Sequence, residues 1–206
     1  MNKTNQQVQI SPVEDLMREH GLLHRILLIY QDIINRMIVS DIYTSEPIYD
    51  CIRESATIVK LFIIEYHQVL EQDYVFPILS QHEKYKQIIQ ILLIQHEAAK
   101  CATDEILTIL ESELKRIRAY QKRLIQLMLE FIQMYEPHSA REDTVIFPAF
   151  HQITPPDTFR ALGEKFEDIE EQKFGENGFQ NVLAHVVQIE KTLGIYDLSQ
   201  FTLKCR

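Results

Sequence analysis

The sequence predicts an all-α protein in which four long helices form a bundle and two shorter C-terminal helices flank it. Only five of the 206 residues are glycine, while Ile, Leu, Glu and Gln are abundant, and apolar residues recur at helical spacing. The length suits one well-buried core, so we expect a single domain over residues 1–206. Its bundle should cover about residues 11–153, and its helical extension about residues 156–206.

The first two helices have clear start signals. The first is predicted to begin at Ser11-Pro12, since serine caps a helix and proline is favoured at its first position. It should fade near Ser40. The second is predicted to begin at Ser45 and to bend or end at Pro77, because proline disfavours helical geometry in the residue before it.

The third helix should follow a short connection at residues 80–84 and end between Leu107 and Ser112. Its inner side is predicted to contain Ile89, Leu92, Leu93, His96, Ala99 and Ile106. The fourth should start near Glu113, with a kink or a slipped turn at Pro137.

The Pro155-Pro156 pair breaks the chain, and two amphipathic helices are predicted after it, near residues 158–171 and 178–193. The first of them carries an acidic run, which we interpret as a solvated face; one carboxylate reaching the mouth of the bundle is the alternative. The run consists of Glu164, Glu167, Asp168, Glu170 and Glu171.

An HxxxE pattern occurs twice, at a constant offset of 71 residues. His67 aligns with His138 and Glu71 with Glu142, and a Phe-Pro pair follows each copy at the same distance. Residues four apart lie on one face of a helix, so each pair projects an imidazole and a carboxylate in the same direction. Each pair can therefore chelate a cation.

Lone histidines lie on the apolar stripes of the first and third helices, at His20 and His96. If the apolar faces pack together, Glu71 and Glu142 become buried, and an unpaired buried carboxylate costs several kcal/mol. Metal cations remove this cost. Pairing with protonated histidines, or exposure of the carboxylates, stays open as the alternative.

The number of donors favours two metal ions. Four imidazoles and two carboxylates are too many for one tetrahedral zinc and suit two iron ions bridged by the carboxylates and an oxo or hydroxo group. These donors fill about ten of about twelve octahedral positions, which leaves about one open position per ion. Zinc and manganese are the substitutes that we expect.

These six residues resemble the ligand set of the hemerythrin-like HHE cation-binding domains. The resemblance covers about residues 11–150 and includes the intervals of 47, 29 and 42 residues and the Phe-Pro pairs. It implies an antiparallel four-helix bundle holding a non-haem di-iron centre. The implied ligands are His20, His67, Glu71, His96, His138 and Glu142.

Within this family, the set resembles that of the di-iron proteins that repair iron centres after oxidative or nitrosative damage. The oxygen carriers have a further histidine where this chain has Lys100. The repair proteins typically carry an N-terminal cysteine-containing domain, which we expect this protein to lack. His24, one turn after His20, is a candidate additional ligand, a hydrogen-bond donor behind the ligands or a gate to the centre.

We therefore expect a protein that binds O₂ or NO, or that acts in the stress response and in iron-centre repair. Two alternatives stay open: an enzyme that reduces peroxide or NO, and a helical interaction module that the metals only staple. Whether the protein is an enzyme, and whether it forms a homodimer, the sequence leaves undecided.

Charge and targeting signals narrow the partners and the compartment. The net charge of −9 and the lack of a Lys/Arg cluster argue against nucleic acid and anionic membranes. No signal peptide or membrane span is recognisable, so we expect a cytoplasmic protein. Cys51, Cys101 and Cys205 are widely spaced, which fits reduced thiols.

Overall fold

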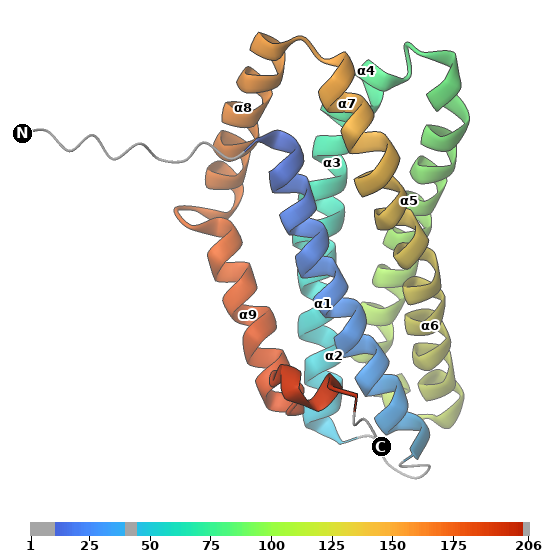
Figure 1. Cartoon of the computed structure of the whole chain (residues 1–206). Coiled ribbons are helices and arrows are strands. Elements are labelled where there is room, and N and C mark those ends of the chain that lie inside the picture. The colour runs from blue at the N-terminus through green and yellow to red at the C-terminus, as the bar shows by residue number, and fades with distance from the viewer. Residues whose placement is uncertain (1–10, 40–44, 204–206) are drawn as a thin grey trace, which may run out of the picture.

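The computed structural model describes residues 11–39 and 45–203, and all regular elements in these ranges are helices. Four of them form the predicted bundle, in which consecutive helices run in opposite directions (Figure 1). The first and third bundle helices are diagonal neighbours, because each packs against both the second and the fourth. The all-α prediction and the four-helix bundle are therefore confirmed.

The first bundle helix is α1 (Pro12–Val39), and it starts as the sequence predicts. The Ser11 side chain caps it by accepting a hydrogen bond from the backbone N–H of Glu14 at 3.2 Å. Its inner side carries a fully buried stripe that includes Leu16, Leu23 and Tyr30. The loop predicted after Ser40 lies outside the described residues up to position 44.

The second bundle helix is continuous but changes its winding twice. It consists of α2 (Glu46–Ile58), the π-helical η1 (Val59–His67), α3 (Gln68–Leu70), the π-helical η2 (Glu71–Val75) and α4 (Phe76–Leu79). The last π turn closes when the Phe76 N–H donates to the carbonyl of Glu71. Pro77, which has no N–H, follows directly, so the change of winding falls where a helical hydrogen bond is missing in any case.

The fourth bundle helix repeats this arrangement at the same offset of 71 residues. It consists of α6 (Arg118–Arg141), the π-helical η4 (Glu142–Ile146) and α7 (Phe147–Ile153), preceded by the 3-10 turn η3 (Glu113–Arg116). The slipped turn thus lies at Glu142. Pro137, where the sequence analysis located it, is inside α6.

The third bundle helix is α5 (Glu83–Leu110), with the end that was predicted. The prediction that Leu93 faces inward is wrong, because its side chain is 40% exposed while Leu92 is 2% exposed. Ile89, Leu92 and His96 follow the three-to-four-residue spacing of one helical face, and position 93 is about 100° away from Leu92 around the axis.

The C-terminal helices are α8 (Pro156–Phe174) and α9 (Gly178–Leu193), followed by the 3-10 turn η5 (Leu198–Phe201). They lie one after the other along the outside of α1, and α9 also contacts α2 (Figure 1). Phe166 and Val186 are fully buried against the bundle, and the Arg25 guanidinium binds the Glu190 carboxylate with both oxygens. These helices therefore extend the core, as predicted, while the single-domain organisation stays a prediction.

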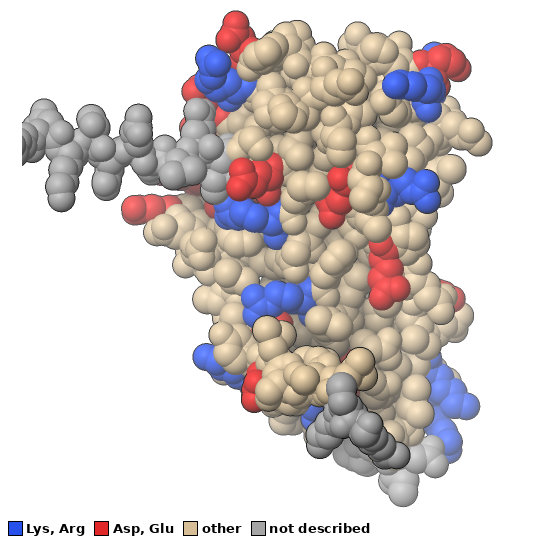
Figure 2. Space-filling view, in the orientation of Figure 1, with Lys and Arg blue, Asp and Glu red and all other residues tan. Residues whose placement is uncertain are grey.

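The surface mixes both signs of charge on the face shown in Figure 2, where lysines and arginines alternate with acidic residues. No helix among residues 11–39 and 45–203 is long and apolar enough to cross a membrane. Cys51 is buried and Cys101 is exposed, both as free thiols, and Cys205 lies outside the described residues.

Candidate metal centre

All six predicted ligands meet inside the bundle and are at most 3% exposed. They form two groups, and within each group one donor atom per residue lies within 4.8 Å of the others. The first group is His20, His67 and Glu71, and the second is His96, His138 and Glu142.

The π-helical turns lie where the ligands are. His67 ends η1, Glu71 begins η2 and Glu142 begins η4. The Nε2 atom of each HxxxE histidine lies close to an oxygen of its own glutamate, at 3.5 Å for Glu71 and 3.1 Å for Glu142. Single π turns are rare and frequently occur at functional sites.

Each carboxylate also reaches the other group. The Oε2 atom of Glu71 lies 3.4 Å from Nε2 of His96, and Oε2 of Glu142 lies 3.4 Å from Nε2 of His20. The two groups are therefore joined by their glutamates, which suits the bridging role that the sequence analysis assigned to them.

The carboxylate oxygens provide the test of whether cations fit here. All four oxygens of Glu71 and Glu142 are buried and have no hydrogen-bond partner, and the same is true of Nε2 of His96. Buried polar atoms without partners are rare because desolvation costs them several kcal/mol. Two divalent cations between these nitrogens and oxygens would satisfy all of them.

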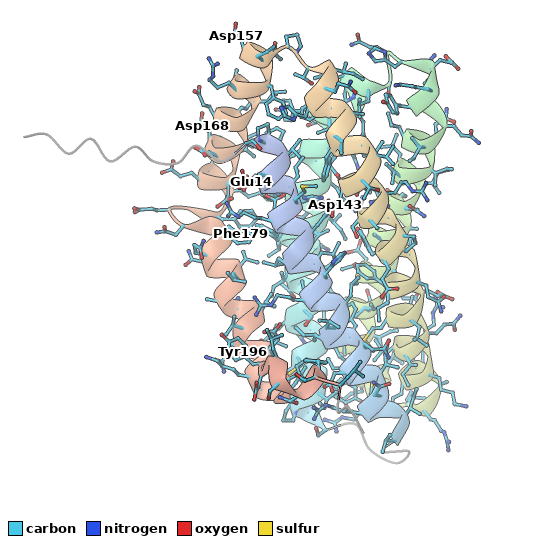
Figure 3. All side chains as sticks on the ribbon, in the orientation of Figure 1. Glu14, Asp143, Asp157, Asp168, Phe179 and Tyr196 are labelled. Atoms are coloured by element: carbon cyan, nitrogen blue, oxygen red, sulfur yellow. The ribbon has the colours of Figure 1, made fainter. Side chains whose placement is uncertain are left out.

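Every ligand histidine is held from behind at its Nδ1 atom by a side chain of another bundle helix. The distances are 2.6 Å from His67 to Glu19, 2.7 Å from His20 to Asp143, 2.8 Å from His138 to Gln95 and 2.9 Å from His96 to Gln72. Asp143, labelled in Figure 3, lies where the fourth bundle helix faces α1. An oxygen that accepts the Nδ1 proton leaves Nε2 free to bind a metal.

These four supports form a closed ring around the bundle. Glu19 on the first bundle helix holds a histidine of the second, and in the same way the second holds the third, the third holds the fourth and the fourth holds the first. At His96 the Gln72 amide nitrogen donates to Nδ1, and turning that amide by half a turn presents its oxygen instead. The sequence analysis missed all four, although each stands next to a predicted ligand in the chain.

In the absence of metal, protons balance the buried carboxylates. Burial lowers the pKa of His20, but its contacts with Asp143 and Glu142 outweigh burial and raise the pKa to about 9. Burial also acts against ionisation of Glu142, and its contacts with His138 and His20 lower its pKa to about 2. Metal binding must therefore displace protons from this site.

The other two histidines titrate in opposite directions. His67 has a pKa well above its usual value, because the charge of Glu71 and the contact with Glu19 outweigh burial. Burial lowers the pKa of His96 to about 3, so His96 stays neutral. The pairing of carboxylates with protonated histidines, left open by the sequence, thus describes the metal-free state.

A cavity of about 520 Å³ leads to His96 from the surface between the second bundle helix and α5. Gln68, Gln72, Glu97 and Lys100 are among the residues that line it. Lys100 occupies the position where the oxygen carriers have a further histidine. A small molecule can therefore approach the second group, and the approach passes charged and amide side chains.

His24 lies outside both groups. Its Nε2 donates to the Ser139 hydroxyl at 2.8 Å, and that hydroxyl donates onward to the carbonyl of Tyr135. His24 lines a separate cavity of about 360 Å³ with Leu28 and Glu136. Burial, followed by the charge of His20, lowers its pKa.

The fold and the site together define a helical-bundle protein with a buried centre of two His/His/Glu groups, suited to a pair of cations. Residues 11–150 match the family described as Hemerythrin HHE cation binding domain, and the chain belongs to that family. An uncharacterized protein of Mycobacterium bovis and one of Mycobacterium tuberculosis are each 46% identical to it over 197 residues, which cover 96% of this chain and 76% of each relative. No solved structure matches the chain.

Proposed function

We propose that the protein holds two iron ions between its two His/His/Glu groups and binds O₂ or NO there. The observation that carries this proposal is the set of four buried carboxylate oxygens of Glu71 and Glu142 that have no hydrogen-bond partner. When bound, a pair of iron ions supplies electron exchange with O₂, NO or peroxide.

The protein's own residues define the site for such a ligand. The ring of Nδ1 supports fixes the four imidazoles, so that their Nε2 atoms keep one direction before and after metal enters. The cavity at His96 is the approach for a small molecule. We place this activity in the cytoplasm, in the response to oxidative and nitrosative stress and in the repair of iron centres, because the ligand set resembles that of the repair proteins.

The test is metal analysis combined with an absorption spectrum of protein from iron-supplemented cells, before and after exposure to O₂ and to NO. We expect two irons per chain and a charge-transfer band that each gas changes. Glu142→Ala should lose the metal and the band, while Glu97→Ala, a cavity residue outside the ligand set, should keep both. A zinc-filled site, or a spectrum that neither gas changes, would contradict the proposal and favour the metal-stapled interaction module.

A buried tyrosine favours the enzymatic alternative enough to test it. Tyr135 is 2% exposed, its ring lies 5.1 Å from that of His138, and its hydroxyl accepts a hydrogen bond from Gln68 at 2.5 Å. A tyrosine so placed can pass an electron and a proton to the centre. An enzyme that reduces peroxide or NO would consume its substrate in the steady state and slow down in Tyr135→Phe, whereas a binding protein would show neither effect.

A further inference from the structure

A third group of acidic side chains lies outside the centre, between α1 and α8. Asp15 and Glu19 from α1 and Glu170 from α8 each contribute a carboxylate oxygen within 4.8 Å of the others. Asp15 is 6% exposed and Glu19 is fully buried. Three carboxylates so close together in a poorly hydrated place repel one another strongly.

Two unpartnered polar atoms accompany this acidic group. The Oε1 atom of Glu19 and the hydroxyl of Tyr66 are buried and make no hydrogen bond, and Tyr66 as a whole is 1% exposed. Burial, followed by the charges of Glu19, Asp15 and Glu170, raises the pKa of Tyr66, so its hydroxyl lies within the field of this group. Orphaned oxygens beside three carboxylates indicate a ligand that accepts electron pairs.

The positive charge around the group does not balance it. Arg18 lies 3.2 Å from Asp15, but its guanidinium also lies over the ring of Phe179, 4.2 Å from the ring centre. Glu170 accepts a hydrogen bond from the backbone N–H of Phe179 at 2.8 Å through Oε1 only. One arginine therefore faces three carboxylates.

The group is open to solvent on one side. A cavity of about 500 Å³ is lined by Asp15, Arg18, Glu167, Glu170 and Phe179. Phe179 marks its position in Figure 3, at the start of α9 and beside α1. A hydrated ion can enter here without passing the apolar core.

We propose that Asp15, Glu19 and Glu170, together with the Tyr66 hydroxyl, form a third cation site that binds a hard divalent ion such as Mn²⁺ or Fe²⁺. All its donors are oxygens, which hard cations prefer, whereas the central groups offer nitrogen and oxygen. The site adjoins the centre through Glu19, because Oε2 of the same carboxylate lies 2.6 Å from Nδ1 of His67.

The position of the site gives it a role in loading the centre. The cavity at His96 opens beside α5, which is diagonally opposite α1 in the bundle, so cations and small ligands approach the centre from different sides. This role rests on the proposed function, whereas the existence of the third site does not.

The existence of the site is tested by titrating the full-length, iron-loaded protein with Mn²⁺ and following free Mn²⁺ by electron paramagnetic resonance. We expect one further Mn²⁺ per chain. Glu170→Gln, whose amide oxygen can still accept from Phe179, should weaken this binding roughly ten-fold or more, because affinity for hard cations follows ligand charge. Glu167→Gln, in the same cavity but outside the group, should leave it unchanged.

A second measurement uses Tyr66 as a reporter. The chain contains no tryptophan, so excitation near the tyrosine absorption can sensitise a bound Tb³⁺ only through tyrosine or phenylalanine. Emission should appear on Tb³⁺ addition and fall several-fold in Tyr66→Phe, while the partly exposed Tyr120→Phe should keep it. Equal emission in both variants, or equal Mn²⁺ binding in Glu170→Gln and Glu167→Gln, would overturn the third site.

The two proposals fail separately. A centre that binds two irons in a chain that binds no further Mn²⁺ would remove only the third site. A centre that takes up no iron, in a chain whose Mn²⁺ site depends on Glu170, would remove only the proposed function. Slower uptake of iron in Glu170→Gln, with the same final two irons, is the result expected for the loading role, and unchanged uptake would exclude that role.

Discussion

The carboxylate of Glu19 joins two acidic environments: its Oε2 atom lies 2.6 Å from Nδ1 of His67, and the same side chain lies within 4.8 Å of Asp15 and Glu170. The charge on this residue therefore acts on the histidine of the centre and on the outer acidic group. Changing it should affect both.

Glu19→Gln should weaken metal binding at the centre about 10- to 100-fold while keeping the same number of sites, because the ligand set is unchanged and only the partner of His67 becomes neutral. Competition with a chromophoric chelator measures the affinity. Glu14→Gln, on the exposed side of the same helix, is the matched control. Identical affinities in the two variants would mean that Glu19 does not support His67 in the loaded protein.

The ligands could be predicted from the sequence because an i, i+4 pair carries its own geometry and the 71-residue repeat doubles the signal. The supports could not. Gln72, Gln95 and Asp143 have no periodicity of their own, and what they contact depends on how neighbouring helices are rotated. For the same reason Glu170 was assigned to a solvated face, although α9 turns back and covers it.

The π turns illustrate the same limit for the fold. The sequence marks the two Phe-Pro pairs as places where a helix is disturbed, and it predicts helices before them. It does not say whether the missing hydrogen bond ends the helix or widens the turn before it, because that outcome depends on the packing around Glu71 and Glu142.

Replacement of a bridging carboxylate should separate stability from function. In the presence of a chelator, Glu71→Met should be more stable than the parent protein by about 1–3 kcal/mol, because it removes buried oxygens that have no partner. In the presence of iron the order should reverse, because only the parent gains the binding free energy. Urea unfolding under both conditions measures this.

The control for Glu71→Met is Glu65→Met, on an exposed position of the same bundle helix, where we expect a change within about 0.5 kcal/mol. If Glu71→Met proves less stable than the parent protein in chelator, the protonated histidines compensate the carboxylate fully in the metal-free state.

His24 should be dispensable for metal binding. Its Nε2 atom is engaged by Ser139, and its ring lines a different cavity, so His24→Ala should retain two metals per chain, whereas His96→Ala should lose at least one. Metal analysis of both variants, purified side by side, gives the answer. A loss of metal in His24→Ala would show that it rotates into the centre as a seventh ligand.

The C-terminal helices should unfold together with the bundle. Phe166 on α8 is fully buried and packs against the ring of Tyr74 at 5.6 Å. Phe166→Ala should therefore cost about 3–5 kcal/mol in the free energy of unfolding of the whole chain, with one cooperative transition by circular dichroism. Two separate transitions, of which only one shifts, would instead mean that residues 156–203 form a unit of their own.

The outer acidic group should make the stability of the cation-free protein depend on pH through Asp15. Burial, followed by the charge of Glu19, raises the pKa of Asp15 to about 7, with Glu170 and Glu167 acting in the same direction and Arg18 against it. Because this pKa is raised above the value in the unfolded chain, the native state holds a proton that the unfolded state has already lost. The contribution of Asp15 to stability is thus present at low pH and is lost as the pH rises through about 7.

Asp15→Asn removes this titration, so its advantage over the parent protein should grow by roughly 2 kcal/mol between pH 5 and pH 8 in the presence of a chelator. Urea unfolding at a series of pH values measures it, with Asp168→Asn, exposed on α8, as the control whose pH profile should follow the parent protein. Added Mn²⁺ should abolish the advantage at pH 8, because the cation replaces the proton among the three carboxylates. Parallel profiles for Asp15→Asn and the parent protein would mean that Asp15 ionises freely in the folded chain, and that the three carboxylates share neither a proton nor a cation.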